Sequence, residues 1–155
     1  MSEILHDTFV IVRRYPKSPV EVFTALSDPG LKRRWFAFEG AETFESDFRV
    51  GGVERYVSRM GPETPFPGTE LASEGRHLDI VPERRVVVSA VMTLGGRPIS
   101  AAQVTYELKE DGDGAELIFT HQAAFFEGSD GPQMRQAGWE AMLDALGRTL
   151  IAEPA

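Results

Sequence analysis

His121 and Tyr106 are the residues of this sequence whose types and placing could do chemistry together. Residues 100–109 and 115–122 are predicted to form two paired strands, and their alternation places His121 on the interior face with Phe119. Tyr106 is then diagonal to His121 across the strand pair. An imidazole and a phenol that face one apolar space could hydrogen-bond to a carbonyl or hydroxyl of a ligand, or act as an acid–base pair. A lone histidine on an apolar face is more often a core residue, so that interpretation also stands.

The sequence brings no second ionisable group to this pair. His77 alternates with Leu78 and Ile80, which are predicted to face inward, so His77 is expected to face solvent, and His6 lies near the N-terminus. No histidine has a helical metal-ligand spacing to a second ligand, and the chain contains no cysteine. We therefore expect no metal and no cofactor. Whether the chain is an enzyme stays open, with binding favoured over catalysis.

Other catalytic patterns are missing from the sequence. No serine lies in a nucleophile elbow, and the glycines form neither a dinucleotide fingerprint nor a phosphate loop. Asp47 and Arg49 flank a predicted turn, where we expect a structural salt bridge. An enzyme of the cyclase, dehydratase or hydrolase kind would therefore depend on His121 and Tyr106 alone.

The net charge of −8 argues against a nucleic-acid partner, because binding to phosphates needs clustered positive charge. The densest basic cluster, Lys32, Arg33 and Arg34, is short and is predicted to be a solvated face. The N-terminal sequence lacks the features of a signal peptide, and no stretch approaches about 18 uninterrupted apolar residues. We expect a cytoplasmic protein that has no membrane partner.

A long amphipathic helix is predicted from residue 131 to the C-terminal region. Asp130 can cap its start, Pro132 suits its first turn, and Pro154 lies beyond its end. Its apolar stripe follows the spacing of one helix face and consists of Trp139, Met142, Leu143, Leu146 and Leu150. One helix with such a stripe needs a sheet to pack against.

Seven strand-like segments precede this helix, and two short helices follow the first strand. The short helices begin at Ser18-Pro19 and Asp28-Pro29, which are helix-start signals. In the hairpin of residues 100–109 and 115–122, opposing Glu110 to Ala115 pairs apolar residues on one face and polar residues on the other. The β-α-α-β6-α order predicts one α+β domain over residues 1–155, with a seven-stranded antiparallel sheet curved around the C-terminal helix.

This order and its motifs resemble the SRPBCC superfamily, which has the START-like, helix-grip fold. Within it, the chain is similar to the family named for the activator of heat-shock-protein-90 ATPase. The resemblance runs from about residue 8 to 150 and rests on Arg13, PVEVFTALSDPGLKRRWF at 19–36, FESDFRVGG at 44–52, GRHLDIVPERRVV at 75–87, QVTYEL at 103–108, AELIFTH at 115–121 and Gly138-Trp139-Glu140. Lys17-Ser18 and Phe36 depart from the usual family residues. The resemblance implies a helix-grip fold with a cavity, but lipid carriers, hormone receptors, cyclases and co-chaperone domains all share that fold.

The expected function is therefore non-catalytic binding of a small hydrophobic or amphipathic ligand between the sheet and the C-terminal helix. The residues expected to line the site are aromatic or flexible and apolar, with one polar anchor: Trp35, Phe38, Tyr56, Met92, Tyr106, Phe119, His121, Trp139 and Met142. The alternative is a co-chaperone-like protein partner in a stress response, which the family name suggests, although no partner-docking extension is evident. A homodimer is also open.

Overall fold

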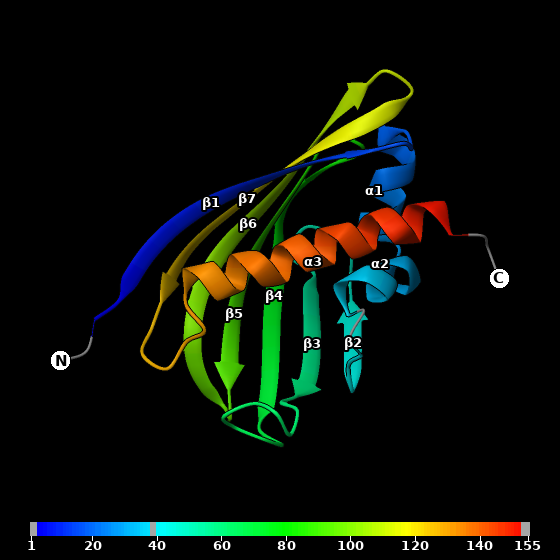
Figure 1. Ribbon diagram of the computed structural model, residues 1–155. Coiled ribbons are helices and arrows are strands. Elements are labelled where there is room, and N and C mark those ends of the chain that lie inside the picture. The colour runs from blue at the N-terminus through cyan, green and yellow to red at the C-terminus, as the bar shows by residue number, and fades with distance from the viewer. Residues whose placement is uncertain (1–2, 38–39, 153–155) are drawn as a thin grey trace.

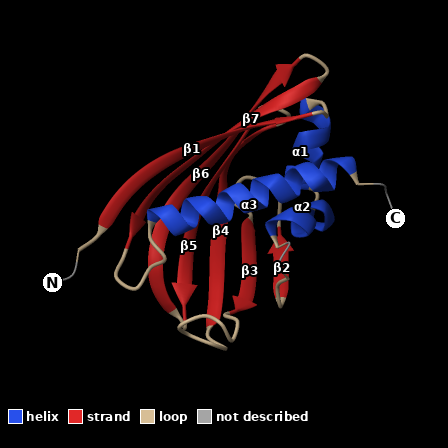
Figure 2. Cartoon of the chain, viewed as in Figure 1, coloured by secondary structure: helices blue, strands red, loops and turns tan. Residues whose placement is uncertain are grey.

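In the computed structural model, which describes residues 3–37 and 40–152, a curved sheet wraps around one long helix (Figures 1 and 2). The elements in chain order are β1 (Leu5–Tyr15), α1 (Pro19–Ser27), α2 (Pro29–Phe36), β2 (Thr43–Ser46), β3 (Val53–Arg59), β4 (Glu70–Val81), β5 (Arg85–Leu94), β6 (Arg97–Asp111), β7 (Gly114–Phe125) and α3 (Pro132–Ile151). The seven strands form one antiparallel sheet in the order β1-β7-β6-β5-β4-β3-β2. The predicted α+β helix-grip fold is confirmed.

Helix starts explain how the chain places its three helices. The side chain of Ser18 accepts a hydrogen bond from the backbone N–H of Glu21, and Asp28 does the same for Leu31. The start of α3 differs from the prediction, because its N-cap is Gly131 with a φ of 85°, a conformation that favours glycine. Asp130 therefore does not cap α3, contrary to the prediction.

The β6–β7 hairpin has the predicted register, with Glu110 opposite Ala115 and Tyr106 opposite Phe119. The inward side chains of these strands pack under α3, whose Trp139, Leu143 and Leu146 are buried as the stripe predicted. Burial of this apolar face supplies the main driving force that holds helix to sheet.

The prediction for His77 is wrong: its side chain is buried, and Leu78 is exposed. The pairing of β4 with β5 shifts between His77 and Asp79, so Leu78 is an extra residue that reverses the alternation after it. As a result His77 and Ile80 both face the core.

Lys32 also departs from its prediction as part of a solvated basic face. It is only 3% exposed and forms an ion pair with Glu54, which is 6% exposed. The expected salt bridge between Asp47 and Arg49 is present on the surface. Among the described residues, no helix is long and apolar enough to cross a membrane.

Candidate ligand-binding cavity

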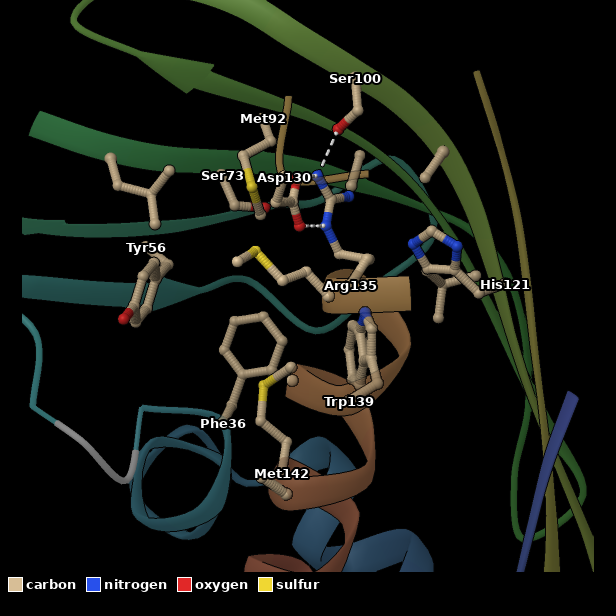
Figure 3. A pocket seen from close by; sticks show the side chains of 17 residues that line it. Phe36, Tyr56, Ser73, Met92, Ser100, His121, Asp130, Arg135, Trp139 and Met142 are labelled. Carbon is tan, nitrogen blue, oxygen red and sulfur yellow. Dashed lines mark hydrogen bonds and ion pairs between the residues drawn. The ribbon is translucent and has the colours of Figure 1, made fainter. Parts of the chain in front are cut away.

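A cavity of about 280 Å³ lies between α3 and the concave face of the sheet. Most of its wall is apolar, and it is formed by side chains from α2, β3, β4, β5, β6, β7 and α3, together with Asp130 from the loop before α3 (Figure 3). The larger apolar side chains that line it are Phe36, Tyr56, Leu71, Met92, Val104, Met134, Trp139 and Met142. A volume of this size suits a small organic molecule.

One part of this wall is polar and centres on Arg135, the first-turn arginine of α3. Its Nε donates to Asp130 at 2.8 Å, and its Nη2 donates to Asp130 at 2.7 Å and to Ser100 at 3.0 Å. Arg135 is 7% exposed, and its guanidinium carbon lies 5.1 Å from the centre of the Phe125 ring. The side chain is therefore held in one orientation from three sides, as Figure 3 shows for two of them.

The carboxyl of Asp130 responds to this arrangement. Its burial alone would raise its pKa, but the hydrogen bonds and positive charge of Arg135 lower the pKa below its ordinary value. Asp130 therefore carries its negative charge at neutral pH. The two side chains form a neutral pair at the edge of the cavity.

His121 lines the same cavity and is 1% exposed. Its ring stacks on Phe9 at 4.6 Å between centroids, with an interplanar angle of 9°. Burial, together with the positive charge of Arg135, lowers the pKa of His121 to about 4. Its Nδ1 is buried and has no hydrogen-bond partner among the described residues. His121 is therefore a neutral imidazole that the protein leaves incompletely bonded.

The structure brings together five of the residues predicted for the site, namely Tyr56, Met92, His121, Trp139 and Met142. Tyr106 instead lines a smaller adjoining cavity of about 40 Å³, together with Glu54. Phe38 lies outside the described residues.

Trp35 and Phe119 lie in the packed core and do not line the cavity. Trp35 is fully buried, and its indole Nε1 donates to the carbonyl of Ala25 at 2.9 Å. The ring of Phe119 lies 4.4 Å from that of Trp139, which covers it on the cavity side. These two aromatic residues therefore position cavity-lining side chains.

Sequence reasoning missed Arg135, Asp130 and Ser100. One signal was available, since Arg135 lies four residues before Trp139 and so falls on the same helix face. Ser100 carried a similar signal, since it has the same parity as Val104 and Tyr106 in the predicted strand 100–109 and so falls on its inward face. Within the described part of the chain, no three histidine, aspartate or glutamate side chains are grouped to hold a metal ion.

Comparison with known proteins places this geometry in a family. Residues 17–150 match the family model described as Activator of Hsp90 ATPase homolog 1-like protein. The chain belongs to this family. Its members share the SRPBCC-type helix-grip fold seen here, which confirms the resemblance found in the sequence.

Several solved structures resemble this member of the Activator of Hsp90 ATPase homolog 1-like family. A protein from Rhizobium leguminosarum is 33% identical, with a TM-score of 0.91 and 99% of each chain covered. The Mll3558 protein from Rhizobium loti is 41% identical, with a TM-score of 0.83 over 95% of this chain and 99% of that one. CalU16 from Micromonospora echinospora is 25% identical, with a TM-score of 0.61 over 97% and 85%. No functionally curated protein matches the sequence.

Proposed function

We propose that this protein binds a small, predominantly apolar molecule in the cavity between α3 and the sheet. The observation that carries the proposal is the cavity of about 280 Å³ with its mainly apolar wall. Apolar surface that stays unfilled in a core is unfavourable, whereas a ligand of matching size regains the lost contacts. A space built into the fold is therefore better explained as a binding site than as a packing defect.

Three methionines support adaptable binding rather than one rigid fit. Met92 comes from β5, whereas Met134 and Met142 come from α3, so flexible side chains line the space from both layers. The unbranched thioether side chain can change rotamer at small energetic cost and still fill irregular space. Ligands of differing shape could be bound by the same apolar wall.

The experiment that tests this proposal is a fluorescence titration with the neutral apolar probe phenylnaphthylamine. Ala102 lines the cavity, whereas its neighbour Ala101 is exposed on the other face of β6. Ala102→Phe should abolish the fluorescence increase by filling the space, and Ala101→Phe should leave it unchanged. The probe should also raise the melting temperature of wild type in proportion to saturation. Equal binding by the two variants would place the probe elsewhere and contradict the proposal.

The acid–base pair of His121 and Tyr106 receives less support. The pKa of His121 falls to about 4, and burial, with a contribution from the charge of Glu54, raises the pKa of Tyr106 well above its usual value. General acid–base catalysis works best with a pKa near the operating pH. The pKa values of both groups therefore lie far from neutral pH, so this chemistry favours binding over acid–base catalysis.

A co-chaperone role is the second candidate, and the family description is what favours it. Its test is the ATPase rate of a heat-shock-protein-90 chaperone measured with and without this protein. Saturable stimulation of that rate by both wild type and Ala102→Phe would support a protein-interaction function independent of the cavity. An unchanged rate, together with probe binding, would leave ligand binding as the function.

A further inference from the structure

The polar part of the cavity wall has hydrogen-bonding capacity that the protein does not use. The Nε and Nη2 atoms of Arg135 make three hydrogen bonds, to Asp130 and Ser100, but Nη1 makes none to a described residue. In Figure 3 this third nitrogen points away from Asp130, toward the side on which His121 lies. A guanidinium has five N–H donors, so two remain for a group inside the cavity.

His121 provides the second unused group on the same wall. It is 1% exposed and lines the cavity, and its Nδ1 is buried without a hydrogen-bond partner among the described residues. A neutral imidazole offers one donor and one acceptor. Buried polar groups in native proteins are nearly always bonded, and a residue left unbonded beside a cavity marks a place where a ligand atom or water completes the pairing.

The charges around this wall determine what kind of group can bind there. Asp130 balances the positive charge of Arg135 through two hydrogen bonds, at 2.8 and 2.7 Å. The polar side chains that line the cavity beside this pair include Ser73, Ser100 and His121, none of which carries a charge. A ligand carboxylate would bring an unbalanced negative charge into a mainly apolar space, which is strongly unfavourable, whereas an uncharged oxygen would not.

From these contacts we infer that the ligand is an uncharged, largely apolar molecule with one oxygen acceptor, such as a ketone or ester carbonyl, that binds Arg135 Nη1 and His121. This inference rests on the proposed binding function and names the ligand class. The carbonyl oxygen would accept from the free guanidinium N–H groups and from the imidazole N–H. The hydrocarbon part would then lie against Trp139 and the methionines.

Three probes of one shape test this assignment in the wild-type protein by calorimetric titration. Acetylnaphthalene carries the carbonyl, isopropenylnaphthalene replaces its oxygen by carbon, and naphthoate replaces the acetyl group by a carboxylate. The ketone should bind about tenfold more tightly than the hydrocarbon, as expected for one recovered hydrogen bond to a charged donor. It should also bind more tightly than the carboxylate.

Variants then show which side chains cause the preference for the ketone. In Asp130→Asn/Arg135→Met, which removes both members of the ion pair, the ketone and the hydrocarbon should bind equally. His121→Phe, which keeps an aromatic ring for stacking, should reduce the preference for the ketone. Met142→Leu is the matched control on the apolar wall, and it should change the affinities of all three probes by a similar factor.

The outcomes distinguish the carbonyl assignment from the proposed ligand binding on which it rests. Equal wild-type affinity for the ketone and the hydrocarbon would overturn the carbonyl assignment while leaving cavity binding intact. Tightest binding by naphthoate would overturn the uncharged class. Binding of none of the three probes would count against the cavity function itself. If the double variant does not fold, the comparison of the three probes in wild type still tests the carbonyl assignment.

Discussion

The ammonium group of Lys32 lies 2.7 and 2.8 Å from the two carboxylate oxygens of Glu54, and the two side chains are 4% and 7% exposed. Ser46 donates a further hydrogen bond to Glu54 at 3.1 Å. The ammonium also lies 4.8 Å from the ring centre of Phe36. This buried pair joins α2 to β3, next to the cavity wall.

Breaking this pair should be far more damaging than replacing it. Lys32→Met leaves the Glu54 carboxylate buried without its partner, and we expect a loss of about 3–5 kcal/mol in the free energy of unfolding. Lys32→Met/Glu54→Leu removes both charges and should be much closer to wild type. Urea unfolding measures both effects. Additive losses in the double variant would show that the two residues act independently.

The stability of the protein should depend on the protonation of His121. Its pKa is about 4 in the folded protein, against 6.5 for an unperturbed histidine. Between these values the unfolded chain binds a proton that the folded chain does not, so the free energy of unfolding falls as the pH falls from 6.5 toward 4. A shift of this size corresponds to about 3 kcal/mol.

The matched variant for this prediction is His121→Phe, which cannot be protonated and can still stack on Phe9. Urea unfolding across this pH range should show a smaller loss of stability in the variant than in wild type. Carboxylates that titrate in the same range are common to both proteins and cancel in the difference. A difference that stays constant with pH would mean that His121 titrates alike in both states.

Two glycines of α3 should respond differently to alanine. A Cβ at Gly138 meets no atom within 4 Å, whereas a Cβ at Gly147 would lie 3.3 and 3.5 Å from ring carbons of Tyr15. Gly138→Ala should therefore gain about 0.5–1 kcal/mol from helix propensity. At Gly147, where the Tyr15 hydroxyl is held by the Leu143 carbonyl at 2.8 Å, the gain should be smaller or absent. Thermal unfolding of the two variants compares them, and an equal gain would contradict the expected crowding.

The parts of the fold that could be predicted are those that short-range patterns encode. The β6–β7 register followed from alternation of apolar and polar residues, and the starts of α1 and α2 from Ser18-Pro19 and Asp28-Pro29. Alternation could not reveal the extra residue at Leu78, because a bulge depends on which strand pairs with β4. For the same reason, alternation predicted the wrong orientation for His77.

The site was only partly predictable for a related reason. Alternation gives the face of a strand on which a residue lies, but not whether it meets open space or another side chain. Phe119 faces inward as predicted and is then covered by Trp139. The charges of Arg135 and Lys32 concealed their burial, because helix periodicity does not reveal the carboxylates that neutralise them, namely Asp130 in the loop before α3 and Glu54 on β3.

The most direct test of binding in the cavity is a methyl NMR titration of the five methionines with phenylnaphthylamine. Met92, Met134 and Met142 line the cavity, whereas Met60 does not and serves as an internal control. Binding inside the cavity predicts saturable shifts of the first three methyl resonances with one common dissociation constant, and an unshifted Met60. Unchanged resonances of Met92, Met134 and Met142 in the presence of excess probe would contradict the account.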